Sequence, residues 1–408
     1  MAKVIDTGKT ISAPVRRIVL MAEFDKGQLG GGESVVLGLI RGLVELGSTS
    51  EIYVIVTSQS MAGAIREFVG PPHQVVCRPP NKVRFLRAQM SNSIARLPKF
   101  HAVLRSLAGR KIQGLPREVS GLDRFVLELA PDLIHYLYPL HFAISQIPSV
   151  YTVHDQNYEH LSDLFEEDYI RWRRTLMAAA TKKASAIIAI SQWVADDICR
   201  IYPHAQDKIH VVKWAPFISK APKEVTGYVE RLPKSFVLYP AVTYRHKNHV
   251  NLIRALSYLN RHDSSDIELV LTGAKNEFWK VIEREVKAVT GSLSVRHLGY
   301  VTEDVLAGLY ERAALVAFPS LFEGVGLPLL EAINMNKQIC CSDIPPFREF
   351  GRDYPRYFDP TDIASIATAI RETLRYGEVR KIAPPLANWR SVACAHRDIY
   401  NRVFEQRL

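Results

Sequence analysis

Residues 319–332 read Pro319-Ser320-Leu321-Phe322-Glu323-Gly324-Val325-Gly326-Leu327-Pro328-Leu329-Leu330-Glu331-Ala332. A short apolar run at 314–318 comes directly before them and is typical of a buried strand. Two glycines separate this strand from Pro328, and proline suits the first residue of a helix because its missing N–H has no partner there. The stretch therefore predicts a strand, a glycine-containing loop and a helix, the unit from which parallel α/β sheets are built.

The same alternation of strands and helices continues on both sides of this stretch. In the C-terminal half we expect strands at 236–241, 267–272, 294–298, 314–318 and 338–342, with helices at 248–260, 276–289, 303–312 and 328–335. In the N-terminal half we expect strands at 17–22, 51–57, 132–136, 149–153, 186–190 and 209–212, with helices at 33–46, 166–183 and after a capping Ser191. These patterns predict two doubly wound, Rossmann-like α/β domains that face a central cleft, where ligands gather at the carboxyl ends of the strands.

The domain boundaries follow from length and local composition. The chain has 408 residues, which is too long for one ordinary hydrophobic core. Residues 214–234 contain several prolines and no clear periodicity, so they are expected to be a linker. We therefore predict a first domain at 1–213, a second at 235–388, and a C-terminal helix at 389–408 that can pack back on the first domain.

The formal net charge of +10 indicates an acidic partner. Residues 78–117 hold ten lysines and arginines and no acid, with apolar residues recurring every three or four positions. Two interpretations stay open: basic helices on an anionic membrane surface, or a solvated helical face beside an acceptor cleft. No nucleic-acid partner is expected, because aromatic stacking platforms and zinc-finger or helix-turn-helix spacings are absent.

The expected location is the cytoplasm, including the inner face of the membrane if the basic segment binds lipid. Residues 1–16 lack the apolar segment of a secretory signal. The longest apolar runs are far shorter than a membrane span and are interpreted as buried strands.

The quoted stretch contains groups suited to an anionic ligand. The free N–H groups of Gly326 and Leu327, at the start of a helix, can hold a phosphate. Glu331, in the first turn, can accept hydrogen bonds from ribose hydroxyls, and Glu323 can reach a sugar hydroxyl or a leaving group. Taken singly, Glu331 also fits a helix-stabilising acid, and Glu323 fits a solvated loop acid.

Three other positions end strands of the predicted sheets. Lys247 follows strand 236–241 and His154 follows strand 149–153, so both are expected at the cleft. Gly30, Gly31 and Gly32 follow the first strand, where they serve either a tight turn or a close approach to a ligand. This loop lacks the Gly-x-Gly-x-x-Gly pattern of nicotinamide-binding proteins.

Residues 319–332 resemble the Glu-x7-Glu signature of the family 4 glycosyltransferases, which adopt the GT-B fold. Residues 236–249 are similar to the family's first donor-domain strand and loop, where a lysine in the place of Lys247 meets the donor diphosphate. His154-Asp155 resembles the family's N-terminal marker, whose histidine contacts the donor sugar. The resemblance extends over residues 149–375. Ala241-Val242 stands where Gly-Arg is common, which leaves more of the phosphate charge to Lys247, aided by Arg245 or His246.

The resemblance implies a retaining transfer of a hexose from a nucleotide diphosphate, without a cofactor. Its expected catalytic residues are Glu323, His154 and Lys247, and its expected donor-binding residues are Glu331, Gly326, Leu327, Lys247, Arg245 and Gly324. No Asp-x-Asp loop is placed to hold a divalent cation, so metal independence is predicted. The pattern is most similar to bacterial mannosyltransferases of surface-polysaccharide assembly. GDP-mannose is therefore the first expected donor, a UDP-hexose the second, and a lipid-linked glycan the expected acceptor.

Two other functions stay open at this stage. A nucleotide-sugar 2-epimerase shares the fold, although it needs acid and base groups at the sugar C2. An inactive sugar-nucleotide-binding subunit would explain the departures from the family pattern at 214–215, 242 and 336–338.

Overall fold

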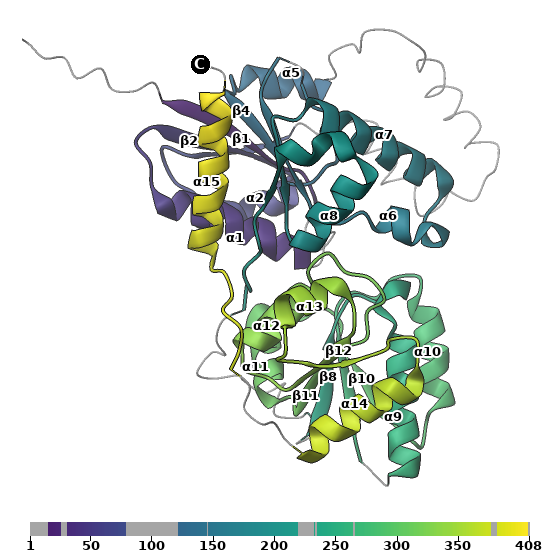
Figure 1. Ribbon diagram of the computed structural model, residues 1–408. Coiled ribbons are helices and arrows are strands. Elements are labelled where there is room, and N and C mark those ends of the chain that lie inside the picture. Colours follow the sequence, from purple (N-terminus) through teal and green to yellow (C-terminus); the bar gives the residue numbers. More distant parts are fainter. Residues whose placement is uncertain are drawn as a thin grey trace, which may run out of the picture. The chain divides into compact units, whose positions relative to one another are not determined.

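The computed structural model describes residues 15–25, 31–78, 121–144, 146–218, 232, 235–263, 266–376 and 382–406 (Figure 1). Gly30, residues 79–117 of the basic segment and most of the predicted linker therefore lie outside the described residues. The chain divides into two compact units, Met1–Asp25 with Ser48–Ile134, and Lys26–Gly47 with His135–Leu408. The domain boundaries expected from the sequence stay a prediction.

The first unit is built on parallel strands. It contains β1 (Arg16–Ala22), β2 (Glu51–Thr57) and β3 (Gln74–Cys77), with helices α2 (Gln59–Arg66) and α5 (Gly121–Glu128). β1 pairs with β2 along its whole length, from Arg16 opposite Glu51 to Ala22 opposite Thr57. Both strands are almost wholly buried, which is typical of a parallel sheet covered on both faces.

Seven strands form the first sheet, in the order β3-β2-β1-β4-β5-β6-β7. The remaining strands are β4 (Leu133–Tyr136), β5 (Ser149–Val153), β6 (Ala186–Ala189) and β7 (Ile209–Val211). Between them lie α6 (Asn157–His160), the 3-10 turn η1 (Ser162–Leu164), α7 (Glu167–Lys183), α8 (Gln192–Ile201) and η2 (Pro203–Lys208). Ser191 caps α8 as predicted, because its Oγ accepts the N–H of Val194 at 3.2 Å.

The second sheet lies wholly within the second unit. Its strands are β8 (Phe236–Pro240), β9 (Glu268–Thr272), β10 (Ser294–His297), β11 (Leu315–Phe318), β12 (Ile339–Ser342) and β13 (Arg356–Phe358). Their order is β10-β9-β8-β11-β12-β13, and every pair is parallel. Chain order reverses between β8 and β11, which is the switch point at which doubly wound sheets bind ligands. The predicted class, two parallel α/β sheets, is confirmed.

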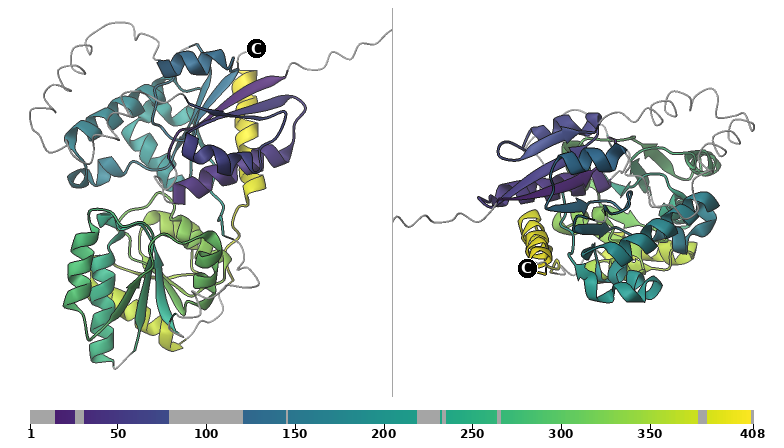
Figure 2. Two further views of the ribbon diagram at one scale, coloured as in Figure 1. Left: turned by 180° about the vertical axis from the view of Figure 1, so that it is seen from behind. Right: turned by 90° about the horizontal axis from the view of Figure 1, so that it is seen from above.

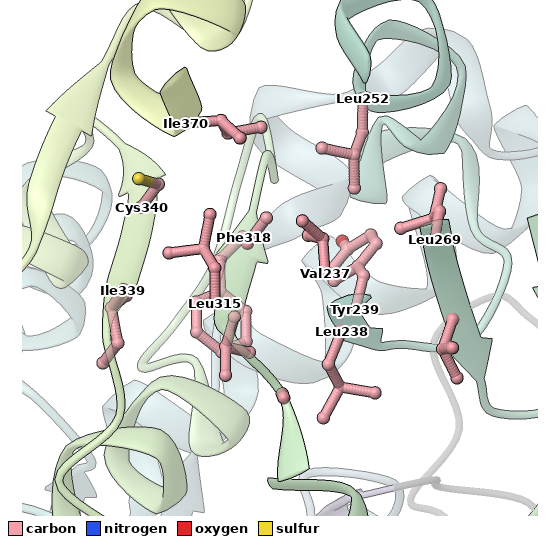
Figure 3. Packing of buried hydrophobic residues seen from close by; sticks show 14 of the residues in the cluster. Val237, Leu238, Tyr239, Leu252, Leu269, Leu315, Phe318, Ile339, Cys340 and Ile370 are labelled. Atoms are coloured by element: carbon pink, nitrogen blue, oxygen red, sulfur yellow. The ribbon is translucent and has the colours of Figure 1, made fainter. Parts of the chain in front are cut away.

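The core of the second sheet is apolar on both faces. Its helices are α9 (His249–His262), α10 (Trp279–Ala288), α11 (Glu303–Arg312), α12 (Leu327–Asn334), α13 (Pro345–Gly351) and α14 (Ile363–Tyr376). β8 and β11 are fully buried along their length. Leu252 of α9 and Ile370 of α14 meet the strands from the same side (Figure 3), and these two helices also contact each other. The rigid central strands thereby fix the loops that leave their carboxyl ends.

The last helix, α15 (Trp389–Glu405), packs beside α1 (Gly31–Leu46), as the yellow and purple helices of Figures 1 and 2 show. The approach is close at Gly42, where an added Cβ would lie 2.6 Å from the main-chain oxygen of Trp389. A polar contact also holds α15, because the Tyr400 hydroxyl lies 2.7 Å from Nδ1 of the buried His135 on β4. The other nitrogen of that ring lies 2.8 Å from Oγ1 of Thr152 on β5.

Two of the expected helix boundaries that differ from the structure bear on predicted site residues. α1 begins at Gly31 rather than Glu33, so Gly31 and Gly32 belong to the helix instead of a preceding loop. α12 begins at Leu327 rather than Pro328, because Gly326 takes the capping position. Such shifts of one or two residues are usual at helix ends. Within the described ranges, none of the helices has the length and apolar character needed to span a bilayer.

Candidate active site

Lys247 and Glu323 meet at the switch point of the second sheet. Lys247 ends the 3-10 turn η4 (Arg245–Lys247) after β8, and Glu323 lies in the loop after β11. The Lys247 Nζ donates to Glu323 Oε1 at 2.6 Å. Their side chains are 20% and 14% exposed, so the pair is largely shielded from water but still reachable. The pairing was not predicted, since each residue was expected to meet a ligand.

Two glycines shape the loop that carries Glu323. A Cβ on Gly324 would collide with the main-chain oxygen of His154, and the Ser191 Oγ donates to the Gly324 carbonyl at 2.8 Å. Gly326 has a φ of 83° and caps α12, and a Cβ there would strike the ring of Phe347. Only glycine combines this left-handed backbone with so close an approach. The loop is therefore held against the ends of β5 and β6.

His154 lies beneath this loop with its ring turned into the protein. The imidazole stacks on Tyr138 with ring centroids 3.9 Å apart, and its Nε2 donates to the Leu137 carbonyl at 2.6 Å. Burial lowers the pKa of His154 to about 4, while the bond to Leu137 opposes that shift. The ring is therefore neutral near pH 7. It also borders a cavity of about 10 Å³, room for roughly one water.

Glu331 is buried and already has hydrogen-bond partners. The Tyr310 hydroxyl donates to its Oε2 at 3.0 Å, and the main-chain N–H of Ile218 bonds to the same carboxyl. Burial raises the pKa of Glu331 to about 8, although both hydrogen bonds act in the opposite direction. The sequence predicted a carboxylate in the first turn of the helix, whereas Glu331 lies beyond the first turn of α12 and the residue is only 5% exposed.

The remaining predicted residues have other neighbours. Gly31 lies beside Leu327, because a Cβ on it would be 3.4 Å from the Leu327 Cδ2. Arg245 instead pairs with Asp163 at 3.1 Å, and both side chains are mostly exposed. Exposed ion pairs contribute little, so Arg245 is free to exchange this partner for another anion at small cost. Gly32 lies in the first turn of α1.

Sequence reasoning missed several residues that organise the site. Asp155, which was named only as the neighbour of His154, is half-buried; desolvation raises its pKa, and the charge of the buried Arg173 acts against that rise. Glu349 of α13 accepts the N–H groups of Gln192 and Trp193 at 2.9 and 3.1 Å, at the start of α8. Tyr310 belongs to the expected helix 303–312 and was given no role there. Neither Glu349 nor Tyr310 stands in a local motif that would have marked it.

A larger cavity, of about 500 Å³, lies elsewhere in the second unit. Pro216, Phe217 and Trp389 are among its lining residues, and none of the predicted site residues borders it. The surroundings of Lys247 and Glu323 remain the better candidate for the ligand-binding site, because charged side chains and main-chain polar groups converge there.

Two family profiles match almost consecutive parts of the chain. The profile described as Glycosyltransferase Family 4 matches residues 29–213, and that described as Glycosyl transferases group 1 matches residues 223–383. The chain belongs to the family 4 glycosyltransferases. The resemblance of residues 319–332 to this family is thereby confirmed.

Among related proteins, O-antigen chain mannosyltransferase B of Escherichia coli is 26% identical over 58% of this chain and 63% of its own length. The O-antigen chain mannosyltransferase RfbU of Salmonella typhimurium is 27% identical over 54% of this chain and 59% of its length. The matches thus span about three fifths of these two relatives.

Solved structures extend the likeness to nearly the whole chain. HepE of Anabaena, in complex with UDP and glucose, has a TM-score of 0.63 at 16% identity, over 96% of this chain and 99% of that one. The sucrose-phosphate synthase of Thermosynechococcus elongatus has a TM-score of 0.67 at 16% identity, over 96% and 100%. At these identities the likeness concerns the fold, and it confirms GT-B.

Proposed function

We propose that the chain is a retaining, metal-independent hexosyltransferase that moves mannose from GDP-mannose to a lipid-linked glycan at the membrane surface in the cytoplasm. The observation that carries this proposal is the Lys247–Glu323 pair at the switch point, next to the glycine-capped start of α12. The names of the two O-antigen relatives support mannose as the sugar. A UDP-hexose is the second donor to test.

In the proposed reaction, the bond between the anomeric carbon and the diphosphate oxygen breaks while an acceptor oxygen bonds that carbon from the same face. The acceptor proton passes to the leaving diphosphate. Lys247 and the N–H groups of Gly326 and Leu327 stabilise the charge that grows on the diphosphate. Glu323, released from Lys247, contacts the sugar, and His154 supports the loop beneath it. Glu331 accepts hydrogen bonds from the ribose.

The test uses the purified full chain with GDP-mannose, UDP-glucose and UDP-galactose. Donor binding should raise the unfolding temperature, because a ligand that binds only the native state stabilises it by about 2.7 kcal/mol at one hundred times its Kd. Lys247→Ala and Glu331→Ala should abolish transfer to a lipid-linked acceptor while the protein stays folded. For Lys247, which stabilises the leaving diphosphate, the loss should be at least about 10²–10³ in kcat.

Lys287→Ala is the matched control, since the ion pair of this exposed lysine among the described residues is with Glu283 on its own helix α10. It should transfer as the unmodified protein does. Full activity in both Lys247→Ala and Glu331→Ala would refute the proposal. A donor epimerised without acceptor would point to the isomerase instead, and binding without either reaction would point to an inactive subunit.

A further inference from the structure

Tyr310 connects two parts of the second unit through a single hydroxyl. The residue lies near the end of α11, and its side chain is wholly buried. Its oxygen lies 3.0 Å from Oε2 of Glu331 and 3.2 Å from the carbonyl of Pro328. Both acceptors belong to α12, so one phenol holds the first turn of this helix together with its only acid.

The Glu331 carboxyl keeps room for further donors. A carboxylate offers about four lone-pair positions on its two oxygens. Among the described residues, Tyr310 and the N–H of Ile218 use two of them. The remaining positions suit a vicinal diol, because its two neighbouring hydroxyls can both donate to one carboxylate. The ribose of a nucleotide carries such a diol.

The titratable groups that face Glu331 in the described structure both come from α11. Tyr310 lowers the pKa of Glu331 through its hydrogen bond, and the negative charge of Glu303 raises it. Arg41 of α1 acts in turn on Glu303. Burial dominates and brings the pKa of Glu331 to about 8. In the empty site at pH 7, the carboxyl is therefore mostly protonated.

We propose that Tyr310 is a positioning residue of the nucleotide site, which holds Glu331 so that the ribose diol binds the carboxylate and displaces its proton. The proposal rests on the proposed function of Glu331. The Glu331 proton leaves to solvent as the two ribose hydroxyls donate their hydrogen bonds. Nucleotide binding and loss of this proton are thus one event, and Tyr310 sets the pH at which it occurs.

The direction of the pH dependence follows from this coupling. The ribose prefers the ionised carboxylate, so affinity should rise with pH and level off above about pH 8, where Glu331 is ionised without ligand. Removing the Tyr310 hydroxyl removes a bond that favours the ionised form. The rise should then move to more alkaline pH. Removing the Glu303 charge should move it to more acidic pH.

The experiment measures the Kd of GDP, with UDP as a second probe, by calorimetry from pH 6 to 9.5. Tyr310→Phe should bind about tenfold more weakly at pH 7, with the difference shrinking toward alkaline pH. Glu303→Gln should bind more tightly at neutral pH, and Glu331→Gln should bind weakly with no pH dependence in this range. Repeating the titration in buffers of different ionisation enthalpy counts the released proton.

The outcomes separate the two proposals. If Glu331→Gln binds as the unmodified protein does, the role proposed for Glu331 fails. If Glu331→Gln loses binding but Tyr310→Phe follows the unmodified curve, or is weaker by one constant factor at every pH, Tyr310 has no positioning role. If Tyr310→Phe does not fold, Glu303→Gln decides: an unchanged curve overturns the coupling.

Discussion

The contact between Gly324 and the His154 carbonyl is the tightest constraint on the loop that carries Glu323. The atom that a new side chain would meet belongs to the backbone, which cannot rotate away as a flexible side chain can. The sequence indicated that this glycine belonged to a ligand loop. It contained no sign that the glycine's neighbour would be the main chain of residue 154, because that contact depends on two strands far apart in the chain.

Gly324→Ala should therefore displace the loop. We expect a loss of about 1–3 kcal/mol in the free energy of unfolding, as for other overpacked sites, together with a large loss of transfer activity. Denaturant unfolding and a transfer assay measure the two effects. Gly63→Ala is the control: it lies in α2 with open space around its Cα, so alanine should stabilise by about 0.5–1 kcal/mol. Normal activity in Gly324→Ala would contradict this prediction, because it would show that displacing the loop does not disturb transfer.

At the scale of elements, the central strands were the easiest to predict. β8 and β11 are continuous apolar runs between loop residues, and both were expected within one residue of their observed bounds. β3 and β13 were missed because they are short and lack a fully buried pattern. α13 was missed as well, since its two leading prolines suggest a loop more readily than a helix start. These elements are stabilised by the strands and helices that they contact. Those contacts cannot be inferred from the local sequence of one element.

The attachment of α15 depends on apolar packing and on polar contacts, among them the buried contact between Tyr400 and His135. Tyr400→Phe would keep the aromatic ring but leave Nδ1 of His135 without the hydroxyl that now lies 2.7 Å away. A buried polar atom without a partner costs about 1–3 kcal/mol. We expect that loss in chemical unfolding, against a change below about 0.5 kcal/mol for the exposed Tyr258→Phe. Equal stability of the two variants would mean that the His135–Tyr400 contact contributes nothing.

For the whole molecule, buried histidines dominate the expected pH dependence. Burial lowers the pKa of His135, His154, His246, His249, His297 and His396 below the usual 6.5. The unfolded chain therefore binds more protons than the folded one as pH falls below 6.5. The histidine contribution to the free energy of unfolding should be fully present above that pH and decline toward pH 4. Each histidine contributes up to about 1.4 kcal/mol per pH unit in that window.

Two acids act in the opposite direction. Burial raises the pKa of Glu331 and of Asp155, so their contribution is present below their unfolded pKa and lost as pH rises. The histidines outnumber them, so a net decline on acidification is expected in denaturant midpoints measured from pH 8 to 4. In His249→Leu, unfolding should take up one proton fewer at acidic pH, so the free energy of unfolding should fall less steeply with decreasing pH. A profile that stays flat below pH 6.5 would contradict this account.

The fold class and the surroundings of Lys247 and Glu323 were thus accessible from the sequence, whereas the state of the site was not. The strand-end positions of Lys247, Glu323 and His154 follow from periodicity and loop glycines. Their mutual arrangement does not: the 2.6 Å ion pair, the inward-turned imidazole and the buried Glu331 depend on residues that come together only in the folded chain.

The contact between α15 and β4 also bears on how the chain is made. His135 and Tyr400 are separated by 265 positions. At a synthesis rate of about 5–20 residues per second, the strand that contains His135 waits roughly 13–53 s for its partner helix. During that interval the apolar face of α1 that later meets α15 is uncovered. A nascent chain of this protein therefore presents a binding surface to chaperones that the finished protein no longer has.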